Sequence, residues 1–389
     1  MSYEGGKKSF VVLQIFVLIG AITAVWMSSG TVPAIVYYGI NLMNPNYFIV
    51  YAFLISSAVS FLLGTSVGTA STVGLALIVM AKGGGVNLNM ASGAIIAGAF
   101  FGDRCSPMSS SANLVANLTA TELYTNIKNM LKSSLIPFII SVILYIVLSL
   151  NQPLNFTDTG IEGQLLLSFK ISLIVLLPSI IILGLSMFRI NVKISMFVSI
   201  LSAIILSIFY QGYSFNEIIK FILLGFYLDP SDPLYAIIKG GGMISMYKPT
   251  IVVFVSCSLA GILETTRVLE GAQTYLEKAK TRSHLFFNTI FVSLFTAAFG
   301  SSQAISVVLT SQLMSKAYAK LKVDKYELAL DIENTGIVLS ALIPWNLAAY
   351  IPTTTMDVSP VGFIPYAFYI YLLPIVSYFV FKKSESKIH

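Results

Sequence analysis

Two segments of the sequence place a carboxylate inside a long apolar run, next to residues that break helices. The first segment reads Gly102-Asp103-Arg104-Cys105-Ser106-Pro107-Met108-Ser109. Pro107 lacks a backbone donor and Gly102 permits an unwound turn, so we expect free carbonyl groups beside the Asp103 carboxylate and several hydroxyls. Hard oxygen ligands of this kind suit a small cation such as Na⁺, and not a transition metal.

A carboxylate in an apolar run is costly, and it is by default a candidate for function. Two other interpretations of this segment stay open. Arg104 follows Asp103 directly and could neutralise it in a structural ion pair. Any single serine could also be a packing residue that hydrogen-bonds between helices. The candidate cation ligands of the segment are Asp103, Ser106, Ser109 and Asn113.

The second segment reads Glu333-Asn334-Thr335-Gly336 and continues to Pro344-Trp345-Asn346. Gly336 and Pro344 mark the places where we expect this helix to open. Glu333 has no adjacent Arg or Lys, so it is either a second cation or proton site or a surface acid at a helix start. In the second case it would pair with Lys325 or favour the helix dipole. The candidate ligands here are Glu333, Asn334, Thr335 and Asn346.

Two glycine-containing turns precede these acidic segments. They read Gly64-Thr65-Ser66-Val67-Gly68-Thr69 and Gly300-Ser301-Ser302-Gln303, and we expect each to form the tip of a hairpin. Their hydroxyls and free backbone groups could complete a cation shell, although small-residue helix packing would explain either turn alone. The recurrence of a tip before each acid favours the functional interpretation. The candidate ligands are Thr65, Ser66, Thr69, Ser301 and Ser302, and the helix breaks are Gly64 and Gly300.

Other patterns that could carry chemistry are weak. Lys82-Gly83-Gly84-Gly85 and Lys239-Gly240-Gly241-Gly242 lack the phosphate-loop pattern and predict flexible joints. The two cysteines and two histidines have no metal-type spacing, and no nucleophile is paired with a base. We therefore expect neither an enzyme nor a cofactor, with Na⁺ and H⁺ as the only small ions involved.

The elements that hold these residues are predicted membrane spans. Of the 389 residues, 56% are hydrophobic and only 10% are charged, whereas about a quarter would be charged in a soluble protein. Apolar runs of about 20 residues recur, and each can cross about 30 Å of hydrocarbon. The net charge of +6 lies in loops between the runs, which is typical of cytoplasmic loops and not of a nucleic-acid surface. The expected partner is the lipid bilayer.

The predicted spans fall into two groups. The uninterrupted ones are Ser9–Ser28, Ser133–Leu150, Leu165–Met187, Val192–Tyr210, Thr250–Thr266 and Phe363–Phe381. The interrupted ones, which carry the segments above, are Phe48–Met80, Gly93–Leu118, Leu285–Met314 and Ile332–Ile351. A free backbone group in hydrocarbon costs several kcal/mol, so we expect the interruptions to face an internal site.

The order of these elements repeats along the chain. Residues 1–150 form a first copy and residues 151–389 a second, and the spans at Leu165 and Val192 have no counterpart in the first copy. The first repeat is therefore expected to lack its two N-terminal spans. If the two hairpins are re-entrant, most of the 23 Lys and Arg residues and both termini fall on the cytoplasmic side, and the copies are inverted. The stretch 211–248 would then be external.

Inverted repeats with discontinuous helices are typical of secondary transporters. At its motif residues the chain resembles the NhaC-type sodium/proton antiporter family, within the ion transporter superfamily, over residues 10–378. The motifs that carry the resemblance are Gly64-Thr65-Ser66-x-Gly68-Thr69, Gly102-Asp103-Arg104-x-Ser106-Pro107-x-Ser109, Asn113-Leu114, Gly261-Ile262-Leu263-Glu264 and Leu342-Ile343-Pro344-Trp345-Asn346.

The resemblance implies secondary transport driven by ion gradients, two inverted repeats with re-entrant hairpins, and a homodimer in the plasma membrane. Members of the family also include exchangers of organic acids and carriers of amino acids. Three departures stand out: Ser110 and Asn334 replace acids that the family usually has, and two N-terminal spans are missing. Losing one carboxylate from each copy weakens the direct argument for exchange, in which Na⁺ and H⁺ compete for carboxylates.

The sequence therefore predicts an all-α, multi-pass membrane protein that works as a Na⁺-coupled secondary transporter by alternating access. Na⁺/H⁺ exchange is the leading hypothesis. The alternatives are a Na⁺-coupled transporter or exchanger of a small organic solute, such as an amino acid or organic acid, and a transport-inactive partner subunit.

Overall fold

A computed structural model describes residues 2–155, 161–188, 190–235, 237–247, 250, 251, 254, 255 and 276–385. In these ranges the chain is helical, and the one strand-like pairing is an isolated bridge between Phe226 and Gly240. The predicted span Thr250–Thr266 lies almost wholly outside the described residues, and so does the motif at 261–264.

Helices follow one another along the described chain, mostly with short connections. In the first part they are α1 (Ser2–Ser28), α2 (Thr31–Leu42), α3 (Phe48–Leu63), α4 (Ser66–Thr69), α5 (Leu75–Gly83), α6 (Leu88–Cys105), α7 (Ser110–Leu118) and α8 (Leu123–Asn151). The next group is α9 (Ile161–Ser168), α10 (Leu177–Met187), α11 (Val192–Leu206) and α12 (Phe215–Leu224). The last group is α15 (Arg282–Gly300), α16 (Gln303–Lys320), α17 (Lys325–Ile332), α18 (Leu347–Thr355) and α19 (Phe368–Glu385).

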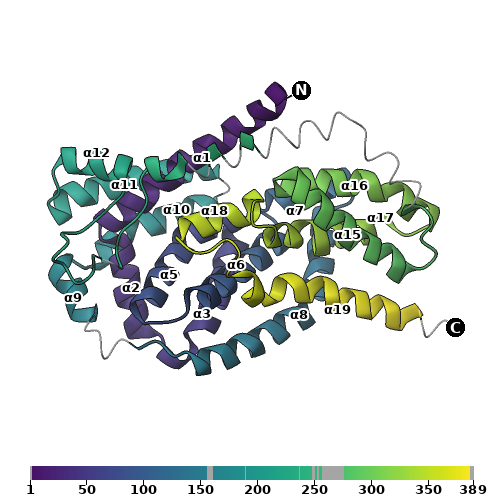
Figure 1. Cartoon of the computed structure of the whole chain (residues 1–389), viewed down its shortest axis with the longest axis horizontal. Helices are drawn as coiled ribbons and strands as arrows, with labels where there is room; N and C mark the ends of the chain where they lie inside the picture. The colour runs from purple at the N-terminus through teal and green to yellow at the C-terminus, as the bar shows by residue number, and fades with distance from the viewer. Residues whose placement is uncertain are drawn as a thin grey trace.

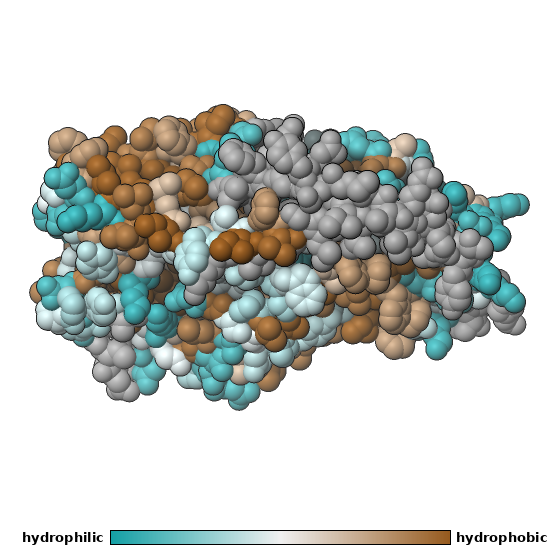
Figure 2. All heavy atoms as spheres, turned by 45° about the horizontal axis from the view of Figure 1, so that its top comes forward, coloured by the Kyte–Doolittle hydropathy of each residue, from teal (hydrophilic) through white to brown (hydrophobic). Residues whose placement is uncertain are grey.

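These helices form an elongated bundle. Figure 1 shows α9 to α12 at one end, α15 to α17 with α19 at the other, and α3, α5 and α6 between them. Figure 2 shows hydrophobic side chains gathered on the outer face over α11 and α12, and hydrophilic side chains near the ends. Exposed hydrophobic side chains of this part of the chain include Ile194, Phe197 and Ile205 on α11 and Phe209 just after it, as expected where lipid replaces water.

Five of the described helical segments are long and apolar enough to cross a membrane: Pro45–Leu63, Ser66–Gly83, Leu123–Asn151, Lys193–Gln211 and Arg282–Gly300. Three bent pairs would bring the number to eight if each pair is one span. The molecule is therefore a multi-pass membrane protein. Because α3 and the α4–α5 segment each have the length of a span, length does not distinguish two crossings from a re-entrant hairpin, and re-entry stays a prediction.

The interrupted segment around Gly64 occurs as predicted. Gly64 ends α3 with φ of 65°, a left-handed conformation that favours glycine, and Thr65 then caps α4 by accepting from the Gly68 amide at 3.2 Å. A π-helical turn at 70–74 connects α4 to α5. The interruption of Gly93–Leu118 occurs as well, because α6 ends at Cys105 and α7 begins at Ser110.

Gly102 does not open the helix, which corrects the sequence prediction. It lies inside α6, and the helix stays regular for three more residues. A side chain at Gly102 would collide with the backbone of α3 at Phe61, and one at Gly98 would collide with the Phe53 carbonyl oxygen. Both glycines are therefore needed for the close approach of α3 and α6.

The C-terminal interruptions also follow the prediction, with one difference. Gly300 ends α15 and Ser301 turns the chain with φ of 58°, so that α16 can begin at Gln303. Pro344 lies in the gap before α18, whereas Gly336 does not open the helix. Residues Glu333–Ile337 form a π-helical turn that continues α17 without a gap, a local widening often found at functional sites.

One predicted uninterrupted span is wrong. Leu165–Met187 is divided into α9 and α10, which meet at 90° around residues 169–172. The bend leaves the backbone amide and carbonyl of Lys170 without helical partners. The Gln211 side chain satisfies both, since it accepts from the Lys170 amide at 3.1 Å and donates to the Lys170 carbonyl oxygen at 3.0 Å. The predicted span Ser9–Ser28 lies within α1, which is followed at 63° by α2.

Candidate functional site

Asp103 is the centre of the strongest candidate site. It lies two residues before the end of α6 and is 3% exposed. Its Oδ2 accepts a hydrogen bond from the Ser66 hydroxyl at 3.0 Å, and its Oδ1 accepts one from the Ser109 hydroxyl at 2.9 Å. Burial of a carboxylate demands such partners, and here they come from two different interruptions of the chain.

The two interruptions are pressed together at this point. A side chain at Gly64 would lie 2.5 Å from the Met108 carbonyl carbon, so the turn after α3 packs directly on the gap between α6 and α7. Ser109 serves both sides of the site: its hydroxyl accepts from the Ser111 and Ala112 amides as the cap of α7, and it donates to Asp103. The local structure of both gaps therefore determines the position of the Asp103 carboxylate.

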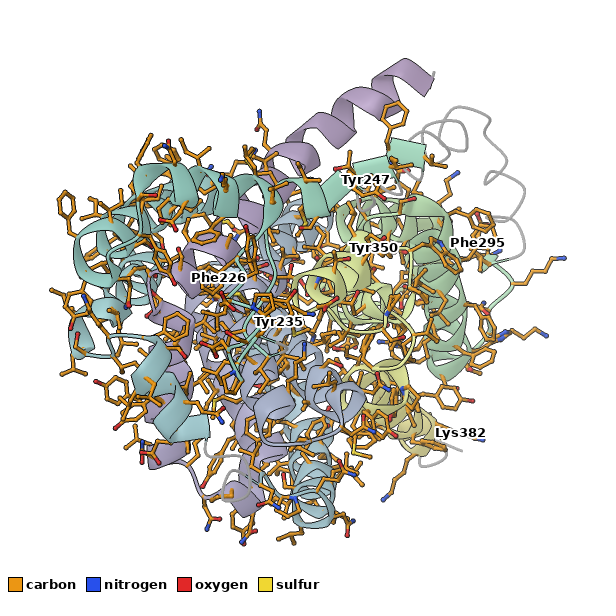
Figure 3. The ribbon with its side chains drawn as sticks, turned by 60° about the vertical axis from the view of Figure 1, so that its left-hand side comes forward. Phe226, Tyr235, Tyr247, Phe295, Tyr350 and Lys382 are labelled. Carbon is orange, nitrogen blue, oxygen red and sulfur yellow. The ribbon has the colours of Figure 1, made fainter. Side chains whose placement is uncertain are left out.

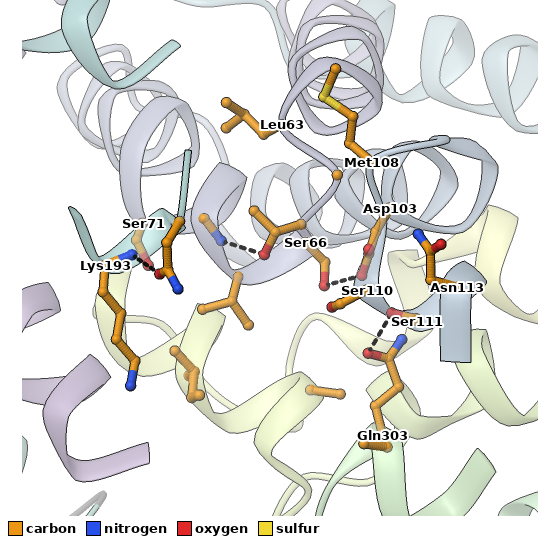
Figure 4. A pocket seen from close by; sticks show the side chains of 18 of the residues that line it. Leu63, Ser66, Ser71, Asp103, Met108, Ser110, Ser111, Asn113, Lys193 and Gln303 are labelled. Atoms are coloured by element: carbon orange, nitrogen blue, oxygen red, sulfur yellow. Dashed lines mark hydrogen bonds between the residues drawn. The ribbon is translucent and has the colours of Figure 1, made fainter. Parts of the chain in front are cut away.

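A pocket of about 810 Å³ opens beside Asp103. Ser66, Ser110, Ser111 and Asn113 line it from the first half of the chain, and Ser302 and Gln303 line it from the second half. Ser111 donates to the Gln303 side-chain oxygen at 3.4 Å across the pocket (Figure 4). Asp103 can therefore be reached by a ligand, through a pocket whose polar side chains lie among a larger number of apolar ones.

The other predicted ligands of the first half bond to nearby backbone and not to Asp103. Thr69 donates to the Thr65 carbonyl oxygen at 2.8 Å, Ser106 accepts from the Met108 amide at 3.1 Å, and Asn113 donates to the Ser109 carbonyl oxygen at 2.7 Å. In the described geometry they shape the two gaps. Thr65 and Asn113 also line the pocket.

Arg104 does not form the ion pair with Asp103 that its position in the sequence suggests. Its guanidinium, which is completely buried, points instead toward α8, α19 and the second half of the chain. It donates to Ser133 at 2.9 Å, to the Tyr369 hydroxyl at 3.1 Å, and to Ser134 and the Asn334 side-chain oxygen. A single cation thus joins the two acid-bearing segments through neutral partners.

Glu333 is completely buried, which excludes the surface position that the sequence left open. Lys325 is not its partner, since the Lys325 amine donates to the Ala120 carbonyl oxygen at 2.6 Å. Neither carboxyl oxygen of Glu333 has a hydrogen-bond partner among the described residues. Its neighbour Asn334 accepts from Arg104 and donates to Ser377 at 3.2 Å. Glu333 is not among the residues that line the pocket beside Asp103.

The second tip is not bonded to Glu333 either. Ser302 caps α16 by accepting from the Ile305 amide at 3.3 Å, and the Ser301 carbonyl oxygen accepts from the Leu347 amide at 2.9 Å. Asn346 donates to the Ala297 carbonyl oxygen at 2.8 Å, and Thr335 donates to the Asp331 carbonyl oxygen at 2.6 Å. The second tip packs on its own gap before α18, and Ser302 of this tip lines the pocket of Asp103.

Three polar residues of the region were not among the predicted ligands. Gln303 and Ser111 connect the two halves across the pocket, which no local pattern reveals. Asp331, two residues before Glu333, is completely buried and pairs with Arg282 at 2.6 Å, while Arg282 also contacts Glu327 at 3.1 Å. The sequence shows that Asp331 lies close to Glu333, which could have marked it as a candidate. Its partner Arg282 lies on α15, and only the fold identifies that pairing.

The sequence of the chain matches a family of known proteins. The model of the Na⁺/H⁺ antiporter family matches residues 98–382. The chain is 28% identical to the Na⁺/H⁺ antiporter NhaC of Alkalihalophilus pseudofirmus, over 96% of this chain and 82% of that protein. It is 27% identical to a malate-2H⁺/Na⁺-lactate antiporter of Bacillus subtilis, over 93% and 79%, and 29% identical to the arginine/ornithine antiporter ArcD of Halobacterium salinarum, over 94% and 76%.

Proposed function

Because this chain belongs to the Na⁺/H⁺ antiporter family, we propose that it is a secondary transporter that exchanges Na⁺ for H⁺ by alternating access. The observation that carries the proposal is the Asp103 site. A buried carboxylate, held by two serine hydroxyls where two helix gaps meet, borders a pocket whose mainly apolar lining contains several hydroxyl and amide side chains. Na⁺ prefers such hard oxygen ligands, and gaps of this kind are where transporters bind their ions.

Na⁺ binds at Asp103 in this proposal. The Ser66 and Ser109 hydroxyls, which donate to the carboxylate in the described state, turn their lone pairs toward the cation when it enters. Backbone oxygens of the gap at 106–109 and the side-chain oxygen of Asn113 complete the shell. Thr65, Thr69 and Ser106 support it by holding the two gaps in shape.

Glu333 holds the proton. A carboxyl group without hydrogen-bond partners in a buried position is best kept neutral, and Glu333 has none among the described residues. A cation that arrives at Asp103 repels this proton through a medium of low dielectric constant. Arg104, bonded to Asn334 next to Glu333, favours the carboxylate that remains after the proton leaves. Binding of Na⁺ and release of H⁺ are thereby coupled.

The remaining features of the transporter are part of the same proposal. Residues 1–150 and 151–389 form two inverted repeats, with re-entrant hairpins at Gly64 and Gly300. Both termini face the cytoplasm, and the protein works in the plasma membrane as a homodimer. The similar way in which each tip packs on its own gap, Gly64 on Met108 and Ser301 on Leu347, supports the repeat.

Proteoliposomes provide the direct test. With an imposed Na⁺ gradient, the intact protein should move protons in the opposite direction, whereas Asp103→Asn and Glu333→Gln should not. Ser110→Ala, which changes a pocket residue that holds no hydrogen bond to Asp103, is the matched control and should keep most of the activity. Proton movement that survives both acid substitutions would refute the assignment.

The size of the pocket favours a second candidate function. About 810 Å³ is far more than a single Na⁺ requires and lies within the range of pockets for small organic ligands. Two relatives are named as exchangers of organic solutes. Na⁺-dependent uptake of labelled lactate, malate, arginine or ornithine without movement of protons would select this function over Na⁺/H⁺ exchange.

A further inference from the structure

Three helical elements run from the pocket of Asp103 to a second pocket, of about 410 Å³. Each element lines the Asp103 pocket and then, three or four residues further along the chain, lines the second pocket. The paired residues are Ile19 and Thr23 on α1, Ser71 in the π-helical turn and Leu75 on α5, and Ile351 and Thr354 on α18. Figure 3 labels Phe226, which lines the second pocket, and Tyr350 on α18. Because a helix rises about 1.5 Å per residue, only about 6 Å of each element separates the two pockets.

This thin barrier is closed to ions in the described state. Ile19, Leu75 and Ile351, which lie at its two ends, are apolar and at most 5% exposed. The elements that carry them, α1, the π-helical turn with α5, and α18, also contact one another. An ion that entered such an apolar contact would lose its water without gaining other ligands. The two pockets are therefore separate cavities in this state.

Two hydroxyls at the barrier lack hydrogen-bond partners among the described residues. They belong to Ser71, which is 1% exposed, and to Thr23, which is 3% exposed. The neighbouring Thr72 has the arrangement usual in helices, since its hydroxyl donates to the Gly68 carbonyl oxygen at 2.8 Å. A buried hydroxyl without a partner is costly, and each such group in a native structure needs an explanation. Both hydroxyls are closed off in this state, and they would gain partners if the barrier opened.

The predicted topology places the two pockets on opposite sides of the membrane. Lys193, in the first turn of α11, lines the Asp103 pocket (Figure 4) and belongs to the cations expected in the cytoplasm. Tyr227 and Lys239 line the second pocket and belong to the stretch 211–248, which is expected outside. In that topology the described state opens Asp103 to the cytoplasm and closes it to the outside.

The walls of the barrier differ in how firmly they are held. The glycines of the second Lys-Gly-Gly-Gly motif pack on α1 and do not form the flexible joint that the sequence predicts. The Gly242 amide donates to the Gly20 carbonyl oxygen at 2.7 Å, and a side chain at Gly241 would lie 2.5 Å from the Ala24 amide nitrogen. In contrast, α18 has nine residues, begins after a gap and ends next to Asp357, whose φ of 54° turns the chain. This short helix, interrupted at both ends, is the wall that can shift most easily.

We propose that the second pocket is the opposite entrance to the Asp103 site, and that α18 is the gate between the two. This inference rests on the proposed exchange of Na⁺ for H⁺. Movement of α18 away from α1 and the π-helical turn would join the second pocket to Asp103. The Ser71 and Thr23 hydroxyls would then line the open route and bind water or the passing ion.

A reversible cross-link of α18 tests the gate. A side chain at Gly74 would lie 3.5 Å from the Sδ of Met356, which caps α18, so a cysteine pair at these positions can be joined. In Gly74→Cys with Met356→Cys, made in a chain whose native cysteines are changed to Ser, oxidation should reduce Na⁺-driven proton movement at least tenfold, and reduction should restore it. The cross-linked protein should keep its Na⁺-dependent rise in Tm, because the Asp103 pocket stays open to the cytoplasm.

The matched control is Gly362→Cys with Asn89→Cys. A side chain at Gly362 would lie 2.7 Å from the Asn89 Cγ, and neither residue lines either pocket. Oxidation of this pair should leave transport unchanged. If the Gly74 and Met356 pair transports equally well before and after cross-linking, α18 is not the gate. An unchanged chain that exchanges no Na⁺ for H⁺ would instead refute the proposed function, so the two failures are distinct.

Cysteine accessibility tests the two entrances without any change at Gly74, and so decides the question even if that variant does not fold. Ser110→Cys, in the Asp103 pocket, should react with a membrane-impermeant maleimide only from the cytoplasmic side. Thr354→Cys, in the second pocket, should react only from the outside. Reaction of both cysteines from the same side would overturn the proposal.

Discussion

The two acid-bearing segments offer nearly equal burial but opposite surroundings. Asp103 has both oxygens hydrogen-bonded and a pocket beside it, whereas Glu333 has no partner among the described residues and lies outside the lining of that pocket. The sequence analysis predicts that the two acids occupy corresponding points of a repeat. Their different surroundings are the reason for the proposal that Asp103 binds the cation and Glu333 holds the proton.

Among the substitutions that test the difference between the two acids, Asp103→Asn should have the largest effect. The amide keeps the size of the side chain and can still bond to Ser66 and Ser109, so the fold should survive. Losing the charge should reduce Na⁺-driven transport by about 1000-fold, equivalent to about 4 kcal/mol of cation binding. The Na⁺-dependent rise in Tm should disappear in the same variant. Normal Na⁺ stabilisation of this variant would place the cation elsewhere.

Glu333→Gln separates the two roles. Proton movement driven by Na⁺ should fall by about 100-fold, equivalent to about 2.7 kcal/mol, because the amide cannot release a proton. The variant should still bind Na⁺, but more weakly, because Gln resembles the protonated Glu333 that opposes the cation in the proposed coupling. Unchanged Na⁺ affinity at every pH would mean that Glu333 does not hold the coupled proton.

Arg104→Gln tests the connection between the two segments. It leaves several buried partners unsatisfied, among them Tyr369 and Asn334, and we expect the protein to lose about 2 kcal/mol of stability. Arg104→Lys keeps the charge but not the planar fork, so it should keep more exchange activity than Arg104→Gln at a similar loss of Tm. Equal activities of the two variants would show that the charge of Arg104 does not act on Glu333.

The smallest effects are expected from substitution of the two serines that cap helices, Ser109 and Ser302. Ser109 and Ser302 each cap the helix that follows a gap, but only Ser109 also donates to a carboxylate. Changing either one to Ala should cost about 1 kcal/mol of stability. Only Ser109→Ala should also weaken Na⁺ binding, by about threefold to tenfold. Isothermal titration with Na⁺ distinguishes the two, and an equal effect would remove the difference between the segments.

The sequence predicted where the chain is interrupted better than it predicted why. Pro107, Pro344, Gly64 and Gly300 all lie at or next to real gaps, because these residues change the local backbone whatever surrounds them. Gly102 looks the same in the sequence, yet it serves the packing of α6 on α3. A glycine that turns the chain and a glycine that allows a second helix to pack closely look the same in the sequence. Only the fold shows whether another helix lies against the glycine.

The candidate site shows the same limit. Asp103, Ser66 and Ser109 could be chosen from residue type and spacing, and the structure brings them together. The partner of Arg104, the position of Gln303 across the pocket and the bend at 169–172 all depend on contacts between distant parts of the chain. Such contacts leave no local periodicity, so no pattern of neighbours could predict them.

The close packing of α3 on α6 has a mechanical consequence. Where even one methyl group has no room at Gly98 and Gly102, the two helices cannot slide past each other, so they must move as one block. Asp103 and Ser109 flank one end of that block, and the turn that carries Ser66 is pressed against the same end. In the proposed mechanism the three side chains that hold Na⁺ would then travel together, and the protein would alternate its access by moving the surrounding helices around an intact ion site.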